Sequence, residues 1–319
     1  MKTQSLGKSD LNVSRIGYGA MYIGGSWDDA PLTDPVREKA SRIVGTALDA
    51  GINFFDHADI YCEGKSEEAF ASIWRTAPYL RQQIYLQSKC GIRFEPPHRF
   101  DFSYEHIMAS VEGSLKRLET DYLDVLLLHR PDPLVEPEEV AHAFDELYQS
   151  GKVRWFGVSN HTAAQIELLK NYLNQPIITN QVQFSLINTQ LLDEGIVFNQ
   201  DNPRTTRNAG TIEYCRLHNI TLQAWGPLGQ GRIRSNPDPK ESPHVHKTIA
   251  LLEEMAAQKG VRPETLLIAW ILRHPALIQP LPGTTNPERL LACCEAIDLH
   301  LSREEWYSLF LVGRGEPLP

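Results

Sequence analysis

The stretch LDVLLLH, residues 123–129, is an almost wholly apolar run with the length of a β-strand. A strand buried on one face alternates apolar and polar residues, whereas a strand of a parallel sheet is buried on both faces and apolar throughout. The run lies between two helical patterns, SYEHIMASVEGSLKRLET (103–120) and PEEVAHAFDELYQSG (137–151). A buried strand between two helices predicts a parallel α/β arrangement at this point.

The same alternation extends in both directions from this stretch. Eight segments of strand length are each followed by helical pattern, and eight such units fit a closed (β/α)8 TIM barrel. An open, doubly wound sheet is the alternative for the same pattern. The expected strands cover residues 15–21, 52–58, 84–89, 123–129, 154–160, 177–184, 221–227 and 277–283. The expected helices cover residues 34–50, 66–76, 103–120, 137–151, 162–173, 205–219, 244–259, 263–273, 287–297 and 302–310.

The two ends of the chain add to this barrel. The turn SLGKSD (5–10) predicts a short N-terminal β-hairpin, and the helical patterns after the last strand predict extra C-terminal helices. We expect one domain over residues 1–319. Three long connections, 90–102, 185–204 and 226–243, follow strand ends and should overhang the catalytic face of the barrel.

Composition argues against several classes of function. A net charge of −9 disfavours a nucleic-acid-binding protein, because phosphates require a basic surface. No apolar run approaches the ~20 residues of a membrane helix, and the N-terminus MKTQSLGKSD has no secretory h-region. Five cysteines without metal-ligand spacing indicate reduced thiols, a cytoplasmic location and no metal site. The pattern makes no prediction of oligomeric state.

Four polar residues lie at or just after three successive expected strands: Asp56, Tyr61, Lys89 and His129. In a barrel these strand ends converge on one pocket. The pKa of a free phenol is about 10, and a nearby ammonium lowers that pKa by stabilising the phenolate. A buried ammonium needs a carboxylate as counter-ion, and a histidine can orient a carbonyl oxygen. Together such groups can protonate an oxygen that becomes an alkoxide, which carbonyl reduction requires.

Three of these residues also have a plainer interpretation. Asp56 would serve equally as a helix cap or salt-bridge partner, Lys89 as a surface lysine and His129 as a turn residue. A barrel hydrolase that uses Asp56 and His129 is a further alternative. The occurrence of all four residues at successive strand ends favours the catalytic interpretation.

Seven motifs, in order, resemble those of the aldo-keto reductase superfamily over about residues 3–310, and particularly its bacterial cytoplasmic NADP-dependent members. The motifs are FFDHADIY, QSK, LLLHRPD, GKVRWFGVSN, NQVQF, AWGPLGQG and PLPGTTNPERL. The resemblance implies an oxidoreductase that reduces an aldehyde or ketone with NADPH. By that resemblance Tyr61 is the general acid, Lys89 and Asp56 tune it, and His129 orients the carbonyl.

The resemblance also implies a cofactor site. Ser159, Asn160 and Gln181 would hold the nicotinamide carboxamide, and Trp225 would stack on its ring, where the family more often has tyrosine. Arg289 would bind the 2′-phosphate of NADP with Thr284, at the start of a helix. The expected cofactor-binding residues are Ser159, Asn160, Gln181, Trp225, Gly226, Pro227, Leu228, Gly229, Gly231, Arg232, Gly283, Thr284, Thr285, Arg289, Ala20 and Met21.

The sequence departs from the family pattern where the 2′-phosphate should bind. Gly283 stands where many members have lysine, and Ala292-Cys293 replaces a frequent Glu-Asn pair. No GxGxxG fingerprint follows the first strand, so a Rossmann site has no support. A cofactor-binding regulatory subunit with little turnover is the alternative function.

The substrate pocket should be lined from the loops. Its expected residues are Met21, Tyr22, Trp27 and Phe94, with further contributions from 185–204. The basic residues Arg93, His98 and Arg99 beside them would suit an aromatic or carboxylate-bearing aldehyde, or would be solvated loop residues.

Overall fold

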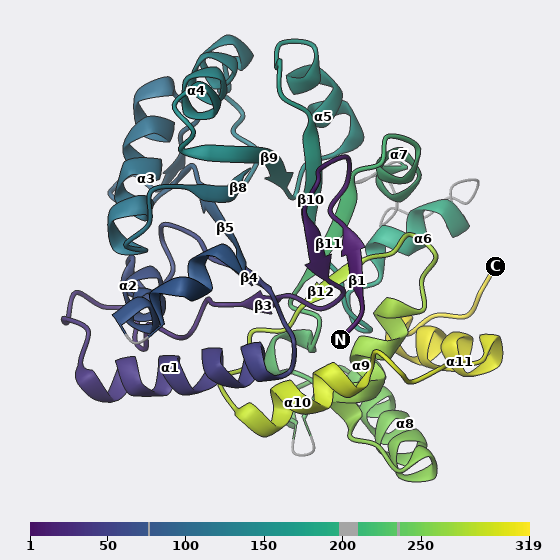
Figure 1. Cartoon of the computed structure of the whole chain (residues 1–319). Coiled ribbons are helices and arrows are strands. Elements are labelled where there is room, and N and C mark those ends of the chain that lie inside the picture. Colours follow the sequence, from purple (N-terminus) through teal and green to yellow (C-terminus); the bar gives the residue numbers. More distant parts are fainter. Residues whose placement is uncertain (76, 198–209, 235–236) are drawn as a thin grey trace.

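The computed structural model describes residues 1–75, 77–197, 210–234 and 237–319. Its centre is an eight-stranded parallel sheet (Figure 1) with the order β12-β11-β10-β9-β8-β5-β4-β3. The strands are β3 (Tyr18–Gly19), β4 (Phe54–Asp56), β5 (Tyr85–Cys90), β8 (Leu123–Leu128), β9 (Val153–Ser159), β10 (Ile177–Gln183), β11 (Thr221–Trp225) and β12 (Gln279–Leu281).

Backbone hydrogen bonds close this sheet into a barrel. The amides of Gly17 and Gly19 donate to the carbonyl oxygens of Pro280 and Pro282 at 3.1 and 3.0 Å, which joins β3 to β12. The predicted (β/α)8 barrel is therefore confirmed, and the open, doubly wound alternative is wrong. All six residues of β8 are buried, as their apolar sequence predicts.

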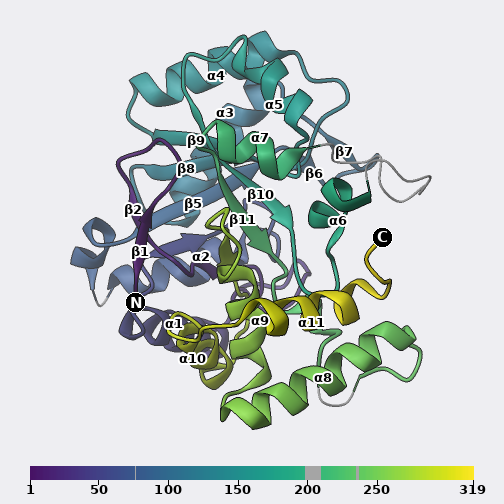
Figure 2. The same ribbon diagram turned by 90° about the vertical axis from the view of Figure 1, so that its right-hand side faces the viewer.

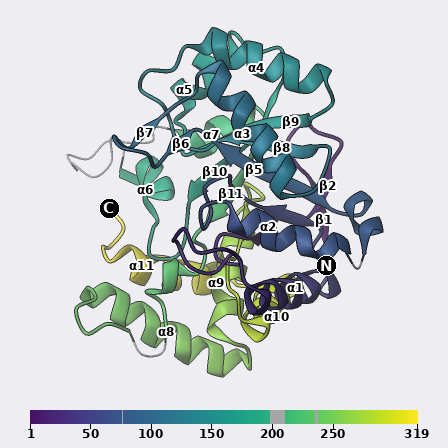
Figure 3. The same cartoon turned by 90° about the vertical axis from the view of Figure 1, so that its left-hand side faces the viewer.

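Helices surround the barrel on its outside (Figures 1 and 3). They are α1 (Asp34–Asp49), α2 (Lys65–Ala71), α3 (Tyr104–Arg117), α4 (Pro137–Gln149), α5 (Ala163–Lys170), α6 (Gln190–Val197), α7 (Thr211–Leu217), α8 (Pro243–Lys259), α9 (Pro263–Leu272), α10 (Pro287–Glu295) and α11 (Arg303–Arg314). Helix α4 shows why they dock: Val140, Phe144 and Leu147 recur at helical spacing and form one buried face. On that face Phe144 stacks on Phe156 of β9, with ring centroids 4.1 Å apart. In Figure 2, α8 and α11 pack together below the barrel.

The predicted N-terminal hairpin forms from β1 (Thr3–Ser5) and β2 (Asn12–Ser14), drawn in purple in Figure 1. Its Leu6, Leu11 and Val13 are buried with apolar residues that line the barrel interior. A side chain at Gly7 would not fit, because a Cβ there would lie 2.2 Å from the carbonyl oxygen of Ile178. The hairpin thus plugs the barrel at the end opposite the strand C-termini.

Several local predictions need correction. Helix α2 begins at Lys65 after a left-handed Gly64. The predicted cap Ser66 lies inside α2, and its hydroxyl donates to the carbonyl of Met21 at 3.1 Å. After α2 the chain continues as a 3-10 turn (Ser72–Arg75) instead of α-helix.

The long connections contain more regular structure than expected. The hairpin β6 (Ile92–Arg93) and β7 (Arg99–Phe100) forms within 90–102, and α6 forms within 185–204. The helix expected over 205–219 is described as α7; residues 198–204 of the expected rim and 205–209 of the expected helix lie outside the described residues. No helix within the described ranges is both long and apolar enough to cross a bilayer.

Candidate active site

The strand ends bring Asp56, Tyr61, Lys89 and His129 together at the mouth of the barrel. Lys89 Nζ lies 2.7 Å from Asp56 Oδ1 and 2.9 Å from Tyr61 Oη. It also donates to the carbonyl oxygen of His57 at 2.7 Å. The Lys89 side chain is wholly buried, so its three protons go to three fixed acceptors. The ion pair expected from the sequence is present in this geometry.

A tight turn places Tyr61 over Lys89. Three successive residues after Tyr61 have left-handed backbones: Cys62, Glu63 and Gly64, with φ of 49, 58 and 87°. The Tyr61 carbonyl accepts from the amides of Gly64 and Ser66 at 3.1 and 3.2 Å, which locks the turn. Left-handed backbone in non-glycine residues is costly, and such strained residues cluster at functional sites. The backbone that carries the phenol is thus fixed by the turn after it.

Burial and charge act against each other on this phenol. Burial raises the pKa of Tyr61, and the attraction of Lys89 lowers it without reversing the net rise. This differs from the expectation of a lowered phenol pKa, because desolvation is the larger effect. For Lys89, burial lowers the pKa, but the attraction of Asp56 and Tyr61 outweighs burial and raises it. Lys89 is therefore an ammonium, and Tyr61 keeps its proton at neutral pH.

His129 completes the group as a neutral imidazole. Its ring lies edge-on to Tyr61, with centroids 5.9 Å apart and planes at 79°. Burial, followed by the charges of Lys89 and Arg130, lowers the pKa of His129 well below its usual value. Its Nδ1 is buried and has no hydrogen-bond partner among the described residues. A neutral imidazole can donate to or accept from one oxygen in the pocket.

A layer of buried glutamines lies beneath Asp56, and sequence reasoning missed it. Gln87 and Gln181 donate to Asp56 Oδ1 at 2.6 and 3.0 Å. Gln223 accepts from Gln87 at 2.9 Å and donates to Gln279 at 2.9 Å. These glutamines come from β5, β10, β11 and β12, and Gln223 is paired in register with Gln181 and Gln279. The sequence did contain a signal for this layer: a glutamine stands at corresponding positions of several largely apolar strands.

The other residues expected at the nicotinamide also meet at strand ends. Trp225 Nε1 donates to Asn160 Oδ1 at 3.0 Å, and Asn160 Nδ2 donates to Ser159 Oγ at 2.7 Å. Ser159 Oγ in turn donates to the Gln181 carbonyl at 2.9 Å. The Gln181 amide differs, because it points to Asp56 in the glutamine layer. Nearby, the amide of Ala20 donates to the Asp56 carbonyl at 2.8 Å, which places Met21 at the mouth.

The turn after β11 is built from the expected glycines. Gly226, Gly229 and Gly231 all have positive φ, and the amide of Gly229 donates to the Gly226 carbonyl at 2.9 Å. Pro227 and Leu228 lie within this turn. Arg232, expected to add charge toward a cofactor, instead pairs with Glu241, at 2.6 Å between Nη2 and Oε2. That pair fastens the connection between β11 and α8.

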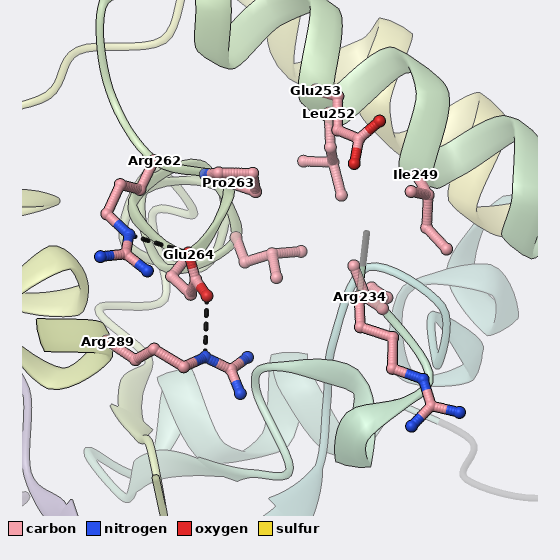
Figure 4. Close-up of a pocket in the computed structure, with 10 residues that line it drawn as sticks. Arg234, Ile249, Leu252, Glu253, Arg262, Pro263, Glu264 and Arg289 are labelled. Carbon is pink, nitrogen blue, oxygen red and sulfur yellow. Dashed lines mark hydrogen bonds and ion pairs between the residues drawn. The ribbon is translucent and has the colours of Figure 1, made fainter. Parts of the chain in front are cut away.

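A cavity of about 230 Å³ lies between this connection, α8, α9 and α10 (Figure 4). Arg234, Arg262 and Arg289 line it, together with apolar and acidic residues. The remaining lining residues are Ile233, Ile249, Leu252, Glu253, Pro263, Glu264 and Leu267.

Only Arg289 of this cavity's residues was expected from the sequence. Its Nε donates to Glu264 Oε1 at 2.8 Å, which holds the guanidinium at the cavity wall. The segment 283–285, which was expected to bind the cofactor as Gly283, Thr284 and Thr285, lies between β12 and α10 and does not line this cavity. The carbonyl oxygen of Thr284 accepts a hydrogen bond from Tyr18 Oη at 3.1 Å. Arg262 and Glu264 lie at the start of α9. The segment VRPE (261–264), with a proline at a helix start between two charged residues, could have identified them from the sequence.

The expected substrate residues form a partly exposed aromatic rim. Trp27 meets Phe94 edge-on with centroids 6.2 Å apart, which links the loop after β3 to the 90–102 connection. Tyr22 is 54% exposed. The loop after β3 is held to α2 by an ion pair, because the buried ammonium of Lys65 lies 2.8 Å from the carboxylate of Asp28.

The model for the aldo/keto reductase family matches residues 15–309. An uncharacterized oxidoreductase of Bacillus subtilis, YcsN, is 35% identical over 97% of this chain and 97% of its own length. A 6-dehydroglucose reductase of Agrobacterium fabrum is 35% identical over 98% of this chain and 99% of its own. The chain belongs to the aldo/keto reductase family.

A solved structure supports the fold of this aldo/keto reductase. The thermostable aldo-keto reductase Tm1743, in complex with the inhibitor epalrestat, superposes with a TM-score of 0.78 and 26% identity over 98% of this chain and 100% of that one. The hydrolase alternative is wrong, because this family and the relatives above are oxidoreductases. Within the described ranges no group of histidine, cysteine and acidic residues could hold a metal ion.

Proposed function

We propose that this aldo/keto reductase reduces an aldehyde or ketone to the alcohol with NADPH, and that Tyr61 is the general acid. The observation that carries this proposal is the buried chain from Asp56 through Lys89 to Tyr61, with a neutral His129 beside the phenol. A structural salt bridge would not need a phenol on its far side. An acid that must deliver a proton to a growing negative charge does need such an arrangement.

The residues present fit NADPH. Arg289 lines the cavity between α8, α9 and α10 (Figure 4) with its Nε held by Glu264, so that the rest of its guanidinium can meet a 2′-phosphate beside an apolar wall of Ile249 and Leu252 that suits an adenine. At the other end Ser159, Asn160 and Trp225 present a hydroxyl, an amide and an aromatic face, in that order, at the barrel mouth. We propose that these groups hold the two ends of the cofactor. When bound, NADPH supplies the hydride.

The chain's own residues handle the proton. A carbonyl oxygen between Tyr61 Oη and His129 would receive a hydrogen bond from each. Because its pKa is raised by burial, Tyr61 carries its proton at neutral pH and can release it as the oxygen gains charge. Lys89, 2.9 Å from Tyr61 Oη, stabilises the phenolate that remains. Asp56 keeps Lys89 charged, and the amides of Gln87 and Gln181 keep Asp56 in place.

The alternative function is a cofactor-binding subunit with little turnover. The two can be separated by titrating the protein with NADPH and NADH, following tryptophan fluorescence, and then measuring NADPH oxidation over a panel of carbonyl compounds. The panel should include sugar aldehydes, because one relative is named as a 6-dehydroglucose reductase. Binding with turnover supports the proposal. Binding without turnover of any member favours the regulatory subunit, and absence of binding contradicts both.

A further inference from the structure

Arg130 stands at the barrel mouth, directly after His129 and outside the proposed proton chain. Its guanidinium carbon lies 5.4 Å from the ring centroid of Trp225, across the mouth. Its positive charge acts on both Tyr61 and His129. The guanidinium therefore lies at the mouth on the ring of Trp225, within electrostatic range of the proposed acid.

Among the described residues, no oxygen accepts a hydrogen bond from Arg130 and no carboxylate pairs with it; its contact is the face of Trp225. The neighbouring acid Asp132 is already used, because its two oxygens accept from the amides of Phe102 and Leu134 at 3.0 and 2.9 Å. Arg130 is half-buried, and burial lowers its pKa. A desolvated cation without an anion is costly, and an aromatic face compensates for only part of that cost.

The other basic residues around the mouth already have partners. Arg93 is bound by Asp101 at 2.9 Å and Arg99 by the carbonyl of Pro97 at 3.2 Å. Lys65 is bound by Asp28. Of these arginines and lysines among the described residues, Arg130 is the one without a hydrogen-bonded oxygen partner.

We propose that Arg130 binds an oxyanion group of the substrate, a carboxylate or a phosphate, so that the enzyme prefers short acidic carbonyl compounds over neutral ones. This inference rests on the proposed function and names the class of substrate. A guanidinium fits such groups because it donates two parallel hydrogen bonds to two oxygens. Because the guanidinium lies on Trp225 at the mouth that Tyr61 and His129 also border, the anion would lie near the carbonyl, as in an aldehyde of a short carboxylic acid.

The test uses matched pairs of aldehydes that differ in charge. Succinic semialdehyde is compared with butanal, and glyceraldehyde 3-phosphate with glyceraldehyde, by kcat/KM for NADPH oxidation. The wild type should prefer the charged member of at least one pair by about tenfold or more, and the pair that shows it distinguishes carboxylate from phosphate. Arg130→Met should remove that preference, chiefly through KM, while changing the neutral member by less than about threefold.

A second variant guards against a merely structural effect. Arg130→Lys keeps the charge and should recover part of the preference, with NADPH affinity unchanged in both variants. An equal loss on charged and neutral aldehydes would overturn the inference, since it would mean that Arg130 supports Trp225 or Tyr61. Turnover of neutral aldehydes with no preference in the wild type overturns this inference alone. Turnover of no carbonyl compound at all removes the proposed function as well.

Discussion

At the scale of single residues, the buried ammonium of Lys89 is the point on which the proposed chemistry depends. Lys89→Met leaves the carboxylate of Asp56 buried without its counter-ion and Tyr61 without its cation. We expect turnover to fall by about 100-fold or more, and the protein to lose several kcal/mol of stability, on the order of 3–5.

Steady-state kinetics and urea unfolding measure the two effects of Lys89→Met separately. Lys89→Arg keeps a positive charge beside Asp56 and is the control for the lost ion pair. It should retain more stability than the methionine variant. Activity of Lys89→Met close to that of the wild type would contradict the assigned role of the lysine.

Arg289 carries a prediction about cofactor choice. Its guanidinium lines the cavity proposed for the 2′-phosphate and is held there by Glu264. Arg289→Ala should weaken NADPH binding by about tenfold or more and leave NADH binding nearly unchanged, because only NADPH carries that phosphate. Fluorescence titration with both cofactors measures this. An equal loss for both would show that Arg289 does not read the phosphate.

At the scale of elements, the N-terminal hairpin depends on a close approach to β10. Gly7→Ala would force a Cβ to 2.2 Å from the Ile178 carbonyl oxygen, at a residue whose φ is already +55°. Gly151→Ala is the matched control, because Gly151 also has positive φ, +72°, but open space around it. Both substitutions place a side chain on a left-handed backbone, which destabilises the folded state in each variant. The free energy of unfolding of Gly7→Ala should be lower than that of Gly151→Ala by at least about 1 kcal/mol, because its Cβ also clashes. Equal losses would mean that the hairpin moves away freely.

The elements also show how far the sequence is predictive. Strand-length segments between helical patterns predict all eight strands, and the strand ends identify which residues converge, because topology fixes where they lie. The start of α2 was not predictable from the sequence. Ser66 has the character of a helix cap, but the helix begins one residue earlier, directly after the left-handed turn that ends at Gly64. Two side-chain contacts were also not predictable: the Gln181 amide binds Asp56, and Arg232 pairs with Glu241. Each side chain has several possible partners nearby, and hydrophobic periodicity does not say which one it binds.

At the scale of the whole molecule, buried neutral histidines link stability to pH. Burial lowers the pKa of His161 from 6.5 to about 4. Because the folded pKa lies below the unfolded one, its contribution is complete above pH 6.5 and is lost as pH falls toward 4. The loss from His161 alone is roughly 3 kcal/mol by that pH. His274, whose pKa burial also lowers to about 4, acts in the same direction.

Urea unfolding between neutral pH and pH 4 measures this linkage. His161→Gln should make the fall in stability between neutral pH and pH 4 shallower than in the wild type. Identical slopes for the two proteins would show that His161 does not take up a proton on unfolding.

The central claim is that Tyr61 delivers the proton in carbonyl reduction, and Tyr61→Phe tests it most directly. The measurement is the rate of NADPH oxidation by a reactive aldehyde, with NADPH affinity determined on the same protein by fluorescence titration. We predict a fall in turnover of about 100-fold or more, with cofactor affinity within about twofold of the wild type. Turnover that survives the loss of the phenol hydroxyl would contradict the account.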